Sequence, residues 1–76
     1  MIEVVVPSDV WEGDAEASVN VWFFEDGESV QEGALLGELM FEKTAVEVRA
    51  PRDGTLRIKA PPETVVHKGD VIAVIE

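Results

Sequence analysis

Residues 39–48 read Leu39-Met40-Phe41-Glu42-Lys43-Thr44-Ala45-Val46-Glu47-Val48. Leu39 and Phe41 fall on one side of an extended segment because strand side chains alternate, and the segment after the lysine alternates in the same way. The polar run 42–44 separates the two segments, which is typical of a β-hairpin tip. Since the run contains neither Gly nor Asn, we expect a type I turn rather than a primed turn. The pattern therefore predicts a short hairpin with the ammonium group of Lys43 at its tip.

An internal repeat flanks this hairpin. Residues 28–39 and 64–75 share the pattern V-x-x-G-x-h-h-x-x-h, where h is aliphatic, and an offset of 36 positions places Gly33 on Gly69. The same offset aligns Val30 with Val66, Leu35 with Val71, Leu36 with Ile72, and Leu39 with Ile75. Two copies of one unit predict a closed pair related by a pseudo-twofold axis, because a solenoid needs about three or more repeats. We also expect Gly33 and Gly69 to have positive φ angles at equivalent turns.

The remaining segments read as short strands and turns, and none has a helical period. The expected strands are 2–6, 18–25, 35–41, 45–50, 55–60, 65–66 and 71–75. Residues 8–17 read as a surface loop in which Trp11 covers an edge of the core. We therefore predict that residues 1–76 form one all-β domain of about seven or eight strands. The expected architecture is a flattened barrel or sandwich of two short antiparallel sheets, a barrel-sandwich hybrid.

Composition and charge exclude several classes of function. The chain has 76 residues, no cysteine and a formal net charge of −10, so we expect no disulfide and no binding to nucleic acid. No apolar run is long enough to span a membrane and no signal peptide is evident, so we expect a cytoplasmic protein, or a mitochondrial one if the source is eukaryotic. Eleven of the sixteen acids precede Lys43, the first basic residue. This acidic part either solvates the surface or steers the domain to basic patches on partner enzymes.

The sequence offers no catalytic constellation. Close carboxylate pairs are inevitable among sixteen acids, and so small a sandwich has little room for a cleft between them. His67 is the only histidine, and its place beside a turn predicts a solvated edge position. No histidine cluster for a metal and no Gly-rich phosphate loop is present. We therefore expect a non-catalytic domain.

Several short motifs, taken together, resemble one family. They are Trp22, Asp26-Gly27, Val30, Gly33, Leu36, Lys43, Val46-Glu47-Val48, Ala50-Pro51, Gly54, Val66 and Gly69-Asp70. In order and in register with the repeat, they resemble the lipoyl domains of 2-oxo acid dehydrogenase complexes, within the biotinyl/lipoyl carrier family. Gly33 stands ten residues before the lysine and Gly54 eleven after it, which is the family spacing. The resemblance implies that Lys43 carries lipoic acid in amide linkage, with Glu42 and Thr44 as flanking recognition residues.

The residues around Lys43 depart from both branches of that family. Lipoyl domains usually read Glu-Thr-Asp-Lys-Ala, whereas this chain reads Met40-Phe41-Glu42-Lys43-Thr44. Biotinyl domains usually read Ala-Met-Lys-Met, and no methionine adjoins Lys43. The lipoyl interpretation is the better one because an acid still precedes the lysine. Two alternatives remain: a biotinyl carrier of a carboxylase, and an unmodified interaction module of the same fold.

The resemblance also implies partners. A lipoate ligase or lipoyl transferase would attach the cofactor, and a thiamine-dependent 2-oxo acid decarboxylase would acylate it. The acyl group would pass to coenzyme A at an acyltransferase core, and dihydrolipoyl dehydrogenase would reoxidise the dithiol. The chain would shuttle intermediates between these active sites as an excised domain or a free-standing carrier, monomeric in isolation.

Overall fold

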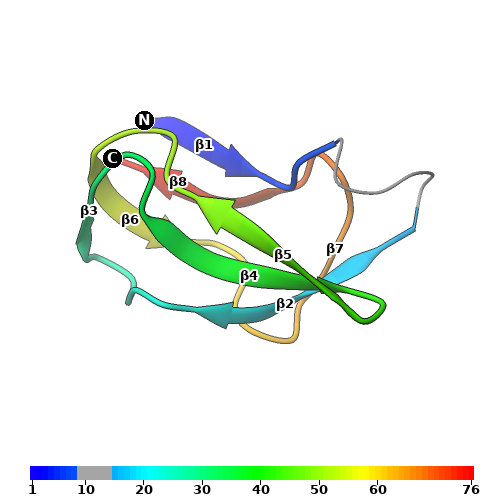
Figure 1. Ribbon diagram of the computed structural model, residues 1–76. Helices are drawn as coiled ribbons and strands as arrows, with labels where there is room; N and C mark the ends of the chain where they lie inside the picture. Colours follow the sequence, from blue (N-terminus) through cyan, green and yellow to red (C-terminus); the bar gives the residue numbers. More distant parts are fainter. Residues whose placement is uncertain (9–14) are drawn as a thin grey trace.

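The protein folds into two four-stranded antiparallel sheets that face each other (Figure 1). The computed structural model describes residues 1–8 and 15–76. The strands are β1 (Ile2–Val5), β2 (Ala17–Trp22), β3 (Ser29–Val30), β4 (Leu35–Phe41), β5 (Thr44–Arg49), β6 (Gly54–Ile58), β7 (Val65–Val66) and β8 (Val71–Ile75). One sheet has the order β1-β8-β6-β3 and the other β5-β4-β2-β7. The predicted all-β sandwich is confirmed.

The two sheets are related by the predicted pseudo-twofold symmetry. Exchanging β1 with β5, β2 with β6, β3 with β7 and β4 with β8 converts the strand order of one sheet into that of the other. The turn glycines obey the same symmetry, since Gly33 has φ 84° and Gly69 has φ 88°. The amide of Gly33 donates to the carbonyl of Ala50 at 2.9 Å, and that of Gly69 donates to the carbonyl of Val6 at 3.0 Å. The predictions of an internal pair and of positive φ at both glycines are confirmed.

The core lies between the sheets and consists of the inward side chains of both repeats. The largest fully buried side chains are Leu36, Leu39, Leu56, Ile72, Ile75, Val6 and Val19. Burying one such side chain stabilises a fold by about 1.5–3 kcal/mol. Trp22 packs partly against this core, and its indole Nε1 donates to the carbonyl of Ala60 at 2.8 Å. This hydrogen bond links β2 to the segment that follows β6.

Some strand ends differ from the prediction. The strand expected over 18–25 ends at Trp22, and after one more hydrogen bond, from the amide of Phe23 to the carbonyl of Leu36, the chain turns at residues 25–28, where the amide of Glu28 donates to the carbonyl of Glu25. The strand expected over 55–60 ends at Ile58, where the amides of Lys59 and Ala60 both donate to the carbonyl of Ile72 and interrupt the ladder. The prediction for Trp11 lies outside the described residues. None of the described residues forms a helix long and apolar enough to cross a membrane.

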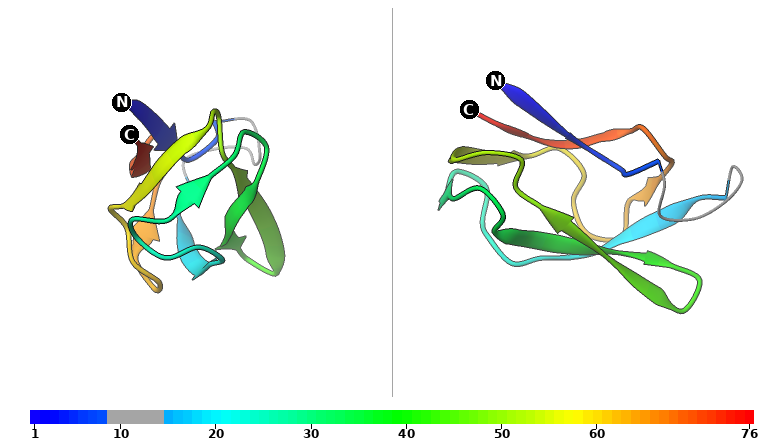
Figure 2. Two further views of the ribbon diagram at one scale, coloured as in Figure 1. Left: turned by 90° about the vertical axis from the view of Figure 1, so that its left-hand side faces the viewer. Right: turned by 45° about the horizontal axis from the view of Figure 1, so that its top comes forward.

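The β4–β5 hairpin and the chain termini lie at opposite ends of the molecule. The longest dimension is 32 Å, and the right-hand view of Figure 2 shows the hairpin at one end and both termini at the other. Ile2 pairs with Ile75 at the terminal end, whereas Phe41 pairs with Thr44 at the hairpin end. The fold therefore presents the hairpin on the side away from its termini.

The lysine hairpin as candidate functional site

Lys43 occupies the tip of a hairpin with a two-residue loop. Phe41 pairs with Thr44, so Glu42 and Lys43 are the two loop residues. Glu42 has φ 55°, whereas the first central residue of a type I turn has φ near −60°. The prediction of a type I turn is therefore wrong. A two-residue loop must match the right-handed twist of its strands, and this favours a positive φ at the first central position even without glycine.

The hairpin has a buried base and an exposed tip. Leu39 is 1% exposed and its partner Val46 is 9% exposed, while Phe41 packs partly against the core. The loop residues and Thr44 are exposed. The core thus holds the two strands in place. Beyond the last pair, Phe41 and Thr44, the loop exposes Lys43 to solvent. The predicted placement of Lys43 at a hairpin tip is confirmed.

The amine of Lys43 is accessible to another protein. Among the described residues, no carboxylate lies within ion-pair distance of its Nζ, and its side chain makes no hydrogen bond with them. Glu42 and Thr44, the predicted recognition residues, flank it on the same exposed tip. Such an amine suits covalent attachment of a cofactor, because it is exposed and none of the residues that the structure describes pairs with it.

A shallow hollow lies beside the tip. It has a volume of about 260 Å³ and is lined by Glu16, Ala17, Ser18, Met40, Glu42 and Val65. Strand pairing builds it, since β2 lies between β4 and β7. Sequence reasoning missed Glu16 and Val65 as neighbours of the hairpin, because only the order of strands in the sheet brings them there. A second hollow of about 210 Å³ lies between the edge strands β1 and β5. Both are below the size of typical small-molecule sites, about 300–1,000 Å³.

His67 lies on the surface, as predicted. Its Nε2 is 3.2 Å from Glu16 Oε2, its Nδ1 is 3.6 Å from Asp70 Oδ2, and its side chain is 57% exposed.

The residues 1–8 and 15–76 contain no group of three or more His, Cys, Asp or Glu side chains that could hold a metal. The hydrogen bond and charge of Glu76 raise the pKa of Arg57, and this ion pair links β6 to the last residue.

Comparison with known proteins gives a consistent result. A family model described as "Biotin-requiring enzyme" matches residues 3–75. The dihydrolipoyllysine-residue acetyltransferase components of the pyruvate dehydrogenase complexes of Staphylococcus aureus and Staphylococcus epidermidis are each 33% identical to this chain over 69 residues. The alignment covers 90% of this chain and 16% of each relative. The chain thus corresponds to a small part of these longer proteins.

Proposed function

The chain belongs to the biotinyl/lipoyl attachment family, and on that premise we propose that it is a lipoyl carrier domain with Lys43 as the attachment residue. The observation that carries the proposal is an exposed lysine at the tip of a hairpin whose base is buried in the core. The domain is a carrier and not itself a catalyst. Its role is to hold the lipoyl-lysine side chain at a fixed position, away from the core.

The residues of the tip fit covalent attachment. A lysine amine is protonated in neutral water, so a ligase must remove the proton before the amine attacks an activated acyl group. The strands β4 and β5 extend the sheet up to the exposed two-residue loop. The tip of the hairpin can therefore enter the active site of a ligase with the lysine side chain in front. When bound, lipoic acid supplies a dithiolane that accepts an acyl group together with two electrons. Lys43 holds the lipoyl group through an amide bond, and the hairpin fixes the point of attachment.

The neighbours of the lysine favour lipoyl over biotinyl attachment. Glu42 and Thr44 stand where biotinyl domains carry methionine, and burying a carboxylate in a pocket built for a thioether is costly. The relatives are also named for a dihydrolipoyllysine residue. A biotinyl carrier is the second candidate, favoured by the description of the matching family as biotin-requiring.

We further propose partners for the carrier. They are a lipoate ligase or lipoyl transferase, a thiamine-dependent 2-oxo acid decarboxylase, an acyltransferase core and dihydrolipoyl dehydrogenase, in the cytoplasm or mitochondrial matrix. When a carrier is tethered to its partner enzymes, its encounters with their active sites become intramolecular, and the effective concentration of the carrier at those sites is raised. The acidic surface favours partners with basic patches, since the formal net charge is −10.

The decisive experiment is the intact mass of the protein isolated from its native host, followed by peptide mapping. We expect one lipoyl group on Lys43 and none after Lys43→Arg, because a guanidinium is not a nucleophile. A biotinyl mass would select the second candidate. Modification of Lys59 or Lys68 in the Arg variant would refute the assignment of Lys43.

A further inference from the structure

We propose that two copies of this chain form a strand-exchanged dimer by opening the β4–β5 hairpin. In this dimer the first repeat (β1–β4) of one copy packs on the second repeat (β5–β8) of the other. The loop residues Glu42 and Lys43 straighten into a hinge between the two lobes. The partner is thus a second copy of the same chain, and the exchange goes beyond the carrier function and does not depend on it.

The two repeats pair with each other along most of their strands. Among the described residues, four of the six strand pairings join the first repeat to the second: β1 with β8, β2 with β7, β3 with β6 and β4 with β5. The covalent link between the repeats is a two-residue loop. A repeat of another copy offers the same strand edges and the same core, so exchange keeps all six pairings. Domain swapping of this kind is a low-cost route to a dimer.

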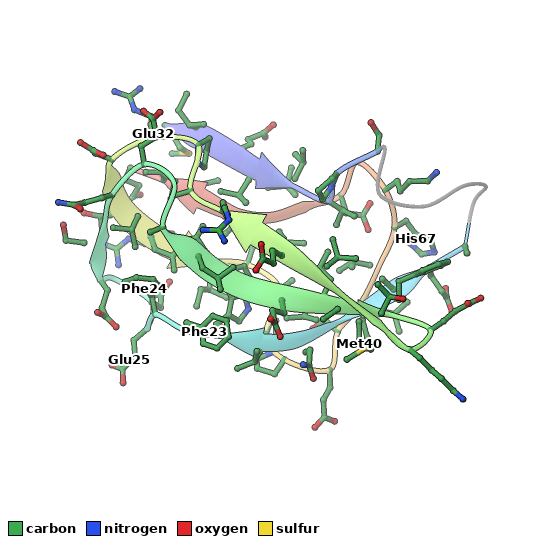
Figure 3. The ribbon with its side chains drawn as sticks, viewed as in Figure 1. Phe23, Phe24, Glu25, Glu32, Met40 and His67 are labelled. Carbon is green, nitrogen blue, oxygen red and sulfur yellow. The ribbon has the colours of Figure 1, made fainter. Side chains whose placement is uncertain are left out.

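The closed loop holds a strained residue. Glu42 has φ 55°, a region that is costly for a residue with a Cβ and that lies outside the β region. Straightening the loop moves Glu42 to the extended region and releases this strain once in each copy. Figure 3 shows Met40 near the end of β4, and the loop beyond it stands clear of the other strands. The described strands therefore leave room for the loop to open.

The hairpin register also makes the opened hinge complementary in charge. Phe41 pairs with Thr44 in the closed hairpin. Continued by one position between two copies, this antiparallel register places Glu42 opposite the partner's Lys43, and Lys43 opposite the partner's Glu42. Opposite charges at directly paired positions of neighbouring strands attract each other. The exchanged dimer therefore gains two ion pairs, whereas in the closed hairpin no described carboxylate lies within ion-pair distance of the Lys43 Nζ.

Other effects keep the monomer dominant at low concentration. Association costs translational and rotational freedom. Each copy also carries a formal net charge of −10, so two lobes repel each other at low salt. Exchange requires the two repeats to separate, which amounts to unfolding, since neither repeat holds a complete sheet. The dimer therefore forms during refolding at high protein concentration in moderate salt, and it dissociates slowly once formed.

Exchange changes the surroundings of Lys43. In the monomer the residue occupies an exposed two-residue loop, whereas in the exchanged dimer it lies within one continuous strand over residues 35–49. An enzyme that recognises the hairpin tip finds no tip in the dimer. Amide formation on Lys43 would remove its charge and with it the complementary pair, so the modified domain stays monomeric. This last consequence rests on the proposed function, whereas the exchange itself does not.

The test refolds the unmodified chain from urea at about 1 mM and at about 10 µM protein and measures the oligomeric state by size-exclusion chromatography with light scattering. We expect a dimer fraction at the higher concentration that persists for hours after dilution. To identify exchange, isotope-labelled and unlabelled chains are refolded together. Contacts between Leu39 and Val46, which pair across β4 and β5, are then recorded by isotope-filtered NMR. We expect these contacts between chains in the dimer and within one chain in the monomer.

Variants of the hinge separate strain from charge. We expect Glu42→Gly to weaken dimerisation by about thirtyfold or more, because glycine adopts a positive φ in the closed loop without the cost of a Cβ. Glu42→Lys keeps a Cβ at position 42 but places like charges opposite each other, so we expect dimerisation to weaken by about fivefold or more.

The matched control combines Glu42→Lys with Lys43→Glu. It restores opposite charges across the hinge, and we expect its dimerisation constant to lie within about twofold of the wild type. Lys43→Gln, whose side chain is an uncharged amide, should weaken dimerisation without any need for a ligase. Thermal unfolding of each monomeric variant checks that the fold is kept.

The outcomes decide the proposal. Monomer alone after refolding at the higher concentration would overturn it, and so would a dimer in which Leu39 contacts Val46 of its own chain. Equal dimerisation of wild type and Glu42→Lys would refute the argument from charge at the hinge. A failure of Lys43 to carry a lipoyl group would refute the carrier function and leave the refolding results unchanged.

Discussion

Alanine at Gly33 or Gly69 isolates the conformational cost of the two symmetry-related turns. A Cβ at either position would meet no atom of residues 1–8 or 15–76 within 4 Å, so no contact among these residues is lost or strained. The φ angles of 84° and 88° cost a residue with a Cβ about 1–2 kcal/mol. The smaller freedom of the unfolded alanine chain offsets about 0.4–1 kcal/mol of this. Each substitution should therefore lower the free energy of unfolding by about 1 kcal/mol.

Gly37→Ala provides the steric contrast. A Cβ there would collide with the carbonyl oxygen of Val21 and lie 3.2 Å from the Cα of Trp22. Both are backbone atoms of β2, so relief requires the central strands β2 and β4 to separate. Overpacking of this kind costs about 3 kcal/mol. A chain of 76 residues has a total stability of roughly 4–11 kcal/mol, so this one methyl group removes a large part of it.

Urea unfolding followed by tryptophan fluorescence measures all three variants. We expect equal losses for Gly33→Ala and Gly69→Ala, with a fall in Tm of about 4–8 °C each, and a loss about three times larger for Gly37→Ala. The double variant at 33 and 69 should lose about 2 kcal/mol, because independent sites add. A stabilised Gly33→Ala, or losses at 33 and 69 that differ by more than about 1 kcal/mol, would refute the argument from conformation and symmetry.

Three further predictions concern the tip and the core. Lys43→Arg should unfold at the same temperature as wild type and carry no lipoyl group by intact mass, since the charge and the exposed hairpin are kept. Glu42→Met combined with Thr44→Met should raise the rate of biotinylation and lower that of lipoylation in ligase assays, because rejection by a carboxylate is removed; unchanged rates would place recognition elsewhere, such as in residues 8–17. Trp22→Phe should cost about 1 kcal/mol in urea unfolding, because it leaves the carbonyl of Ala60 without its indole donor.

Local pattern and the repeat determined most of what could be predicted. The alternating apolar residues around Lys43 predicted the hairpin, and the aligned glycines predicted two equivalent turns. Both predictions succeeded because a hairpin or a turn depends on only a few consecutive residues. The repeat then implied two similar sheets. The role of Lys43 as attachment residue came from the resemblance to a family and stays a prediction.

The features that were missed depend on contacts between distant segments. The turn at Glu42 takes a positive φ because of the twist of its strands, which the loop residues themselves do not encode. β2 ends at Trp22, shortly before the turn in which the amide of Glu28 donates to the carbonyl of Glu25. The hollow beside the tip needs the pairing of Ser18 with Val65, 47 positions apart in the sequence. No local pattern reports such a pairing.

The exchange of strands between the repeats bears on how this chain arose. Each sheet takes two strands from the first repeat and two from the second: β1 and β3 join β6 and β8, and β2 and β4 join β5 and β7. Neither repeat holds a complete sheet, so neither is a folding unit by itself. An ancestor with a single repeat would have been an intertwined dimer, whose stability falls on dilution. Joining the two repeats in one chain removes that dependence, and the β4–β5 turn is the joint between them. Lys43 stands at this joint, between the last strand of the first repeat and the first strand of the second.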